Sequence, residues 1–186
     1  MKRAFIFLAE GFEDTEALGT LDVLRRGGID ASLVSITEDP FVVSSRGVAV
    51  GVDYCFCELD NIDSEDIMIF PGGMPGTKNL AACDALIEKM KGHHAKGGTL
   101  AAICAAPGLV LSQLPSLESY TLTCFDGFES YIEAKGGKYD PKPAISCGDI
   151  ITGRSAGYSL YFGLEILRKL SDEANVERVR KGLFLD

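Results

Sequence analysis

The chain has 186 residues, of which 46% are hydrophobic and 24% charged, and its formal net charge is −9. This length and composition predict one globular domain over residues 1–186, without a visible linker and large enough to bury a core. The few basic residues are scattered, so they offer no patch for a nucleic-acid backbone and argue against a nucleic-acid partner.

The first segment, MKRAFIFLAEGFEDTEAL, places two basic residues before an apolar stretch, as a secretion signal does. That stretch, residues 4–9, is shorter than a signal requires, and Glu10 and Glu13 follow it. We therefore interpret it as a strand. No segment approaches the length of a membrane span, which predicts a soluble, cytoplasmic protein without a membrane partner.

Strand-like and helix-like segments alternate along the chain. The expected strands are 4–9, 31–36, Ile67–Phe70, Thr99–Ile103 and 120–123. The expected helices are 14–26, 83–95, 107–114, 127–135, 156–170 and 173–181. Short β segments are expected within residues 41–56, and AISCGDIITG reads as a terminal hairpin with Gly148-Asp149 at its turn. This alternation predicts an α/β fold with a parallel sheet and helices on both faces.

Three loops of unusual composition follow three of these strands: AEGFEDTE, PGGMPGT and CAAPG. Because ligands of open α/β sheets bind beyond the carboxyl ends of the strands, we expect the loops to meet at one site. Cys104 lies where a strand gives way to a helix, and the N–H groups there favour a thiolate. Cys104 is therefore expected to be the most acidic thiol, although a plain buried cysteine is the alternative.

The other two loops supply candidate partners for that thiol. A backbone N–H group of Gly72-Gly73 could pair with that of Ala105 as an oxyanion hole, unless the glycines only form a tight turn. GGMPGTKN does not match a phosphate-binding loop, so no nucleotide is implied. Glu13, Asp14 and Glu16 suit a helix start as solvated caps, but a carboxylate close to sulfur would share a proton with it.

The remaining cysteines and the histidines indicate no metal or cofactor site. Cys55, Cys57, Cys83, Cys104, Cys124 and Cys147 include no C-x-x-C pair. Cys55 and Cys57 are expected on one side of a strand, where packing is the preferred interpretation over metal binding. His93 and His94 lie near a helix end, which favours a solvated or dipole-stabilising role.

Taken in order, LAEGFEDTEA, SSRGV, FPGGMPG, AAICAAPGLVL and GRSAGYSLYFGLEIL resemble the ThiJ/PfpI (DJ-one) superfamily. The resemblance covers nearly the whole chain and is greatest to the YajL-like bacterial branch. It implies a flavodoxin-like (class I glutamine amidotransferase-like) three-layer sandwich, usually a homodimer. Within it, Cys104 would be the nucleophile, Glu16 the acid bonded to its sulfur, and Gly73 and Ala105 the backbone donors.

The resemblance also implies pocket residues on the rim of this site. Arg46 and Arg154 match arginines found near the family's pocket, although ordinary surface or interface charges are an equal alternative. Phe125 stands on the loop where many relatives place a histidine, and Ala105 stands at the other such position. Without a Cys–His couple, protease or amidase activity is not expected.

Three functions are compatible with these residues. The preferred one, implied by the resemblance, is a cofactor-independent cysteine enzyme of the glyoxalase or deglycase type, acting on small reactive carbonyls. A redox sensor or stress-protective chaperone with an oxidisable Cys104 is the alternative. A protein related to thiazole monophosphate biosynthesis is a third possibility, with Arg46 and Arg154 as its only candidate phosphate ligands.

Overall fold

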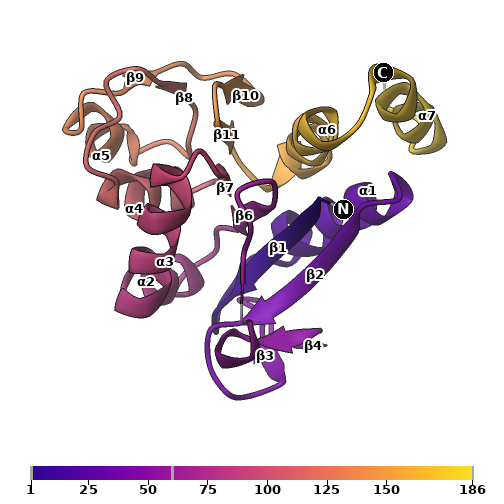
Figure 1. Ribbon diagram of the computed structural model, residues 1–186, viewed down its shortest axis with the longest axis horizontal. Helices are drawn as coiled ribbons and strands as arrows, with labels where there is room; N and C mark the ends of the chain where they lie inside the picture. Colours follow the sequence, from indigo (N-terminus) through magenta and orange to yellow (C-terminus); the bar gives the residue numbers. More distant parts are fainter. Residues whose placement is uncertain (1, 60, 186) are drawn as a thin grey trace.

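A seven-stranded sheet forms the centre of the computed structural model, which describes residues 2–59 and 61–185 (Figure 1). Its strand order is β10-β11-β7-β6-β1-β2-β5, and only the β10–β11 pair is antiparallel. The strands are β1 (Arg3–Leu8), β2 (Asp30–Ser35), β5 (Tyr54–Cys55), β6 (Ile67–Phe70), β7 (Thr99–Ile103), β10 (Ala144–Cys147) and β11 (Ile150–Gly153). The mainly parallel sheet is therefore confirmed.

Helices cover both faces of this sheet (Figure 1). One face packs against α1 (Thr20–Arg26), α6 (Ser159–Leu170) and α7 (Glu173–Gly182). The other packs against α2 (Gly76–Ala81), α3 (Asp84–Ala95), α4 (Ala106–Leu109) and α5 (Glu129–Glu133). The central strands β6 and β7 are buried throughout, as expected for strands covered on both sides. The flavodoxin-like three-layer sandwich is confirmed.

Two hairpins flank the layers. β3 (Phe41–Val43) pairs antiparallel with β4 (Ala49–Gly51), which confirms the predicted β segments. β10 and β11 form the predicted terminal hairpin, and Gly148 at its turn has a φ of 64°. Short helical turns complete the described elements: η2 (Phe56–Glu58), η3 (Leu111–Gln113) and η4 (Ala156–Tyr158).

Four predicted elements differ from the structure, one of them the helix expected over 156–170, which begins as η4 and continues as α6. The helix expected over 14–26 divides into a π-helix, η1 (Thr15–Gly19), followed by α1. The helix expected over 107–114 is the short α4 followed by η3, because Leu114 precedes Pro115 and is extended. The strand expected over 120–123 is β8 (Thr121–Leu122), which pairs with β9 (Lys138–Tyr139) outside the main sheet because β11 occupies the place beside β7.

The expectation for Cys55 and Cys57 is also wrong in part. Cys55 ends β5 and is buried, whereas Cys57 lies in η2 and is exposed, so the turn separates the two thiols. Over the described residues, no group of three or more His, Cys, Asp or Glu side chains is placed to hold a metal ion. Among those residues, no helix is long and apolar enough to cross a lipid bilayer.

Candidate active site

Cys104 stands at a sharp junction between β7 and α4. Its φ is 65°, in the left-handed region that few residues other than glycine adopt. Two hydrogen bonds hold the backbone there: the Cys104 N–H donates to the Gly153 carbonyl (3.0 Å), and the Phe125 N–H donates to the Cys104 carbonyl (2.8 Å). A strained residue fixed by its neighbours is typical of a functional position.

Glu16 is the carboxyl group that reaches this junction. It lies in η1, and only 1% of its surface is exposed. Its Oε2 accepts a hydrogen bond from the Gly72 N–H (2.7 Å). Its Oε1 is buried and has no hydrogen-bond partner among the described residues. Oε2 is therefore held by the backbone, and Oε1 is available to exchange a proton.

Gly72 is the point at which the three predicted loops meet. A Cβ atom added to Gly72 would lie 2.5 Å from Oε2 of Glu16, 2.6 Å from Cβ of Cys104 and 3.1 Å from its Sγ. These separations are shorter than van der Waals contact, so only glycine fits between the carboxyl and the thiol. The predicted convergence of the loops is correct.

Burial and mutual repulsion govern the ionisation of this pair. Burial raises the pKa of Glu16 to about 7; Glu13 adds to the rise, while the Cys104 side chain and the Gly72 N–H oppose it. Burial, followed by the charge of Glu16, also raises the pKa of the Cys104 thiol. The expectation that Cys104 is the most acidic thiol is therefore wrong while Glu16 is ionised: α4 has only four residues, and its effect is outweighed. The two groups therefore titrate as a coupled pair, in which the charge of Glu16 favours the protonated thiol.

The backbone donors predicted from the sequence lie beside the sulfur. The N–H groups of Ala105 and Gly73 both counteract the rise in the pKa of Cys104, because they stabilise a negative charge on sulfur. Gly73 has a φ of 93°, and a Cβ there would collide with the backbone of Phe12 and Glu13. Gly73 therefore forms a tight turn and also directs its N–H toward the sulfur.

Of the three predicted pocket residues, only some lie near Cys104. Phe125 contacts Cys104 through its backbone, and its side chain is 46% exposed. Arg154 follows β11 and pairs with Asp126 (Nη2–Oδ1 2.8 Å). Arg46 lies on the exposed loop between β3 and β4, and no contact joins it to Cys104 or Glu16 within the described chain. The structure brings Cys104, Glu16, Gly73 and Ala105 together, but not Arg46.

The two histidines lie far from the thiol along the sheet. Both are in the last turn of α3, which precedes the start of β7, whereas Cys104 follows the end of β7. The solvated role expected for His93 is wrong: its residue is 5% exposed, and burial lowers its pKa. His94 is partly buried, with Nε2 3.1 Å from the Tyr120 hydroxyl.

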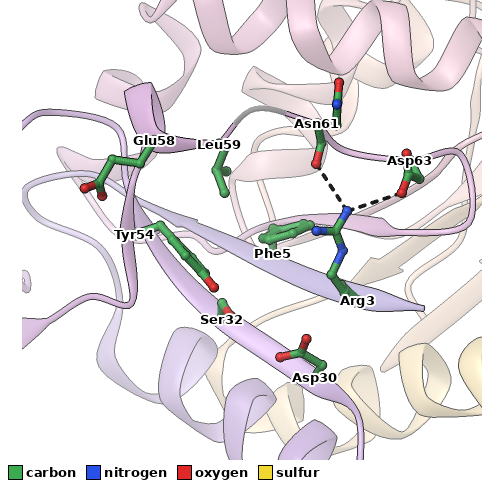
Figure 2. Close-up of a pocket in the computed structure, with 9 residues that line it drawn as sticks. All are labelled: Arg3, Phe5, Asp30, Ser32, Tyr54, Glu58, Leu59, Asn61 and Asp63. Carbon is green, nitrogen blue, oxygen red and sulfur yellow. Dashed lines mark hydrogen bonds and ion pairs between the residues drawn. The ribbon is translucent and has the colours of Figure 1, made fainter. Parts of the chain in front are cut away.

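A separate hollow of about 640 Å³ lies at the amino ends of β1 and β2 (Figure 2). Figure 2 shows Arg3 bonded to the Asn61 carbonyl and to Asp63 across it. None of the nine side chains drawn there is a cysteine or a histidine. The hollow thus lacks the thiol on which the candidate site is built, and that site lies at the opposite, carboxyl end of the strands.

Sequence reasoning did not assign roles to two residues of the site. Gly72, rather than Gly73, binds Glu16 through its N–H. Glu13 accepts a hydrogen bond from the Glu16 N–H through Oε2 (2.7 Å) and donates its own N–H to the Gly72 carbonyl (2.9 Å). The sequence shows a double glycine after a strand and several neighbouring acids. Neither pattern tells which glycine binds Glu16, or which acid reaches the sulfur.

Comparisons with known proteins agree with this geometry. The model of the DJ-1/PfpI family matches residues 2–169. The chain is 29% identical to Protein dj-1beta of Drosophila melanogaster over 184 residues, which are 99% of this chain and 97% of that protein. It is 30% identical to the glutathione-independent glyoxalase DJR-1.2 of Caenorhabditis elegans over 185 residues, again 99% and 97%.

Solved structures give the same result. A DJ-1 superfamily protein from Salmonella typhimurium, crystallised with a cysteine replaced by alanine, superposes with a TM-score of 0.92 at 30% identity and full coverage of both chains. The oxidised DJ-1 of Toxoplasma gondii superposes with a TM-score of 0.91 at 25% identity, covering 100% of this chain and 99% of the other.

Proposed function

Because this chain belongs to the DJ-1/PfpI family, we propose that it is a cofactor-independent cysteine enzyme that converts small α-oxoaldehydes such as methylglyoxal into hydroxy acids. The observation that carries the proposal is the buried Glu16–Cys104 pair, with Gly72 between its members. The similarity to a relative named as a glutathione-independent glyoxalase supports the same reaction class.

The first step begins from the form of the coupled pair in which Glu16 is protonated and Cys104 is not. When the proton resides on Glu16, Cys104 is a thiolate and adds to the aldehyde carbon, forming a C–S bond. The carbonyl π electrons move to oxygen, where the N–H groups of Gly73 and Ala105 stabilise the oxyanion. Proton transfer from Glu16 to this oxygen gives a neutral hemithioacetal and leaves a carboxylate.

The second step moves a proton between neighbouring carbons. The Glu16 carboxylate removes the proton from the sulfur-bearing carbon, which gives an enediol, and returns it to the adjacent carbon. The hemithioacetal hydroxyl proton passes to the former ketone oxygen, so that the aldehyde carbon becomes a thioester and the ketone a hydroxyl. Water then cleaves the thioester, releasing the hydroxy acid and the thiol. The net change is addition of one water, so no external oxidant or reductant is needed. A pKa of about 7 lets Glu16 act as both acid and base near neutral pH.

The direct test is a steady-state assay of methylglyoxal consumption with chemical identification of lactate. Wild-type protein should produce lactate, and Cys104→Ser should not. Cys57→Ser is the matched control, because Cys57 is exposed and lies in η2. Absence of lactate with wild-type protein would reject the proposal.

One observation favours the alternative of a redox sensor. Oε1 of Glu16 is buried without a hydrogen-bond partner among the described residues, so in its protonated form it could donate a hydrogen bond to a sulfinate on Cys104. Peroxide treatment followed by mass spectrometry tests this alternative, which requires oxidation confined to Cys104 at low peroxide.

A homodimer and a cytoplasmic location remain predictions, and sedimentation would test the former.

A further inference from the structure

Arg154 and Asp126 form an ion pair, and the backbone of Cys104 is hydrogen-bonded to the residue that precedes each of them. Arg154 follows Gly153, whose carbonyl accepts the Cys104 N–H. Asp126 follows Phe125, whose N–H donates to the Cys104 carbonyl. The segments on either side of Cys104 thus each carry one member of the pair, which places the pair at the rim of the candidate site.

The guanidinium group of Arg154 is held within the chain. Nη2 lies 2.8 Å from Oδ1 of Asp126, and Nη1 donates to the Pro141 carbonyl (3.2 Å). The Arg154 side chain is 30% exposed and that of Asp126 is 69% exposed. Exposed ion pairs of this kind are weak, so a competing carboxylate can replace Asp126.

We propose that Asp126 is a specificity residue that disfavours carboxylate-bearing substrates at Cys104. This inference rests on the proposed function. Its carboxylate occupies the cation of Arg154 and repels a second anion. Methylglyoxal is neutral, so Asp126 does not repel it and it does not compete with Asp126 for Arg154. An α-oxoaldehyde with a carboxylate tail, such as 4,5-dioxopentanoate, must displace Asp126 before it can use Arg154. Both compounds undergo the same addition of water.

Alkylation of Cys104 measures this effect without requiring turnover. Iodoacetate and iodoacetamide transfer similar groups to sulfur with loss of iodide, and the first is an anion whereas the second is neutral. We expect Asp126→Asn to raise the ratio of the iodoacetate to the iodoacetamide rate constant by up to about five-fold, the upper limit that a weak exposed ion pair allows. Fragment-ion mass spectrometry assigns the alkylated sulfur to Cys104 and separates it from the other five cysteines, including Cys124 on the same tryptic peptide.

Asp140→Asn is the matched control. Asp140 pairs with Lys142 (3.0 Å) on the neighbouring loop, so this variant removes the same charge without freeing Arg154. Its ratio should remain that of the wild type. In the double variant Asp126→Asn/Arg154→Gln, the gain should disappear, because no guanidinium remains to attract the anion.

Three outcomes would overturn the inference: an unchanged ratio in Asp126→Asn, an equal rise in Asp140→Asn, or a gain that persists in the double variant. Turnover adds a second readout, since Asp126→Asn should raise kcat/KM for 4,5-dioxopentanoate relative to methylglyoxal by the same factor. If no variant turns over either compound while the alkylation ratio rises as expected, the proposed function fails and the role of Asp126 as an anion filter stands.

Discussion

Among single residues, Glu13 adjusts the acidity of Glu16 without contacting the sulfur. Its charge contributes to the raised pKa of Glu16, and its Oε2 accepts the Glu16 N–H. Glu13→Gln keeps an acceptor but removes the charge, so the pKa of Glu16 should fall. The pH profile of Cys104 alkylation by iodoacetamide should then move to lower pH. Glu10→Gln is the control, because Glu10 lies on the same loop and accepts the Val43 N–H instead; an equal displacement in both variants would contradict the role of Glu13.

Glu16 itself should be indispensable for turnover. Glu16→Gln preserves an oxygen for the Gly72 N–H but cannot exchange a proton with sulfur or carbon. Lactate formation should fall by roughly 10²–10⁴-fold, as expected for a lost general acid and base. Steady-state kinetics would measure the loss, and turnover within a factor of two of wild type would exclude the acid–base role.

For single residues, the sequence predicted which side chains form the site better than it predicted their pKa values. The position of Cys104 after a strand and its small neighbours could be read directly, and the resemblance selected Glu16 among three nearby acids. The pKa of Cys104 could not be read, because it depends on burial and on a carboxylate 88 positions away in the chain, and the local pattern contains neither.

Where loops pack against each other, Gly72 has no room for a side chain. Gly72→Ala would place a methyl group between Glu16 and Cys104, so we expect loss of lactate formation and destabilisation by about 1–3 kcal/mol, as for other overpacked sites. Gly92→Ala is the control: Gly92 lies inside α3 with nothing near its added Cβ, and alanine there should stabilise by about 0.5–1 kcal/mol. Urea unfolding would compare the two.

Asp66 ties the start of β1 to the segment before β6. Its nearly buried carboxylate accepts hydrogen bonds from the N–H of Arg3 (2.9 Å), from the Arg3 guanidinium (2.6 Å) and from the N–H of Asp63 (2.9 Å). Burial alone would raise the pKa of Asp66, but these bonds outweigh it and the pKa is lowered. The stabilisation is therefore present above the ordinary pKa and lost as the pH falls through the lowered one.

Asp66→Asn should reduce the free energy of unfolding at pH 7 by about 1.5–3 kcal/mol, because charge-assisted bonds are lost. Asp63→Asn affects the same arginine, but Asp63 is 75% exposed and its contact is 3.4 Å, so its effect should stay below about 1 kcal/mol. Urea titrations at pH 7 would check this order. Equal losses in both variants would show that burial does not distinguish the two carboxylates.

Elements with long apolar runs were predictable, and short ones were not. β6 and β7 have the predicted bounds because, apart from Thr99, their residues are apolar. The division of the helix between Gly19 and Thr20 could not be predicted, since a π-helix carries no distinct sequence pattern. Nor could α2, which begins at Gly76 directly after Pro75 and reads as a loop. The misplaced β8 depended on competition with β11 for the edge beside β7, which is a tertiary effect.

Across the whole molecule, Glu16 should make stability depend on pH. The pKa of Glu16 is about 7 in the folded chain and 4.5 ordinarily, so the folded state binds the proton more tightly. Its contribution is fully present below the ordinary pKa and is lost as the pH rises through about 7. The loss is at most about 3 kcal/mol. Thermal unfolding between pH 5 and 8 should show the decline in wild type and a weaker one in Glu16→Gln. Parallel curves would contradict the assignment.

The unpartnered oxygen of Glu16 also bears on how this protein can be engineered. At alkaline pH a buried carboxylate without a full set of donors weakens the fold, so a library selected only for heat resistance would accumulate neutral residues at position 16. Those chains would be durable and inactive. Improvement of the catalyst therefore requires that every round of selection score product formation together with survival, or that position 16 be withheld from randomisation.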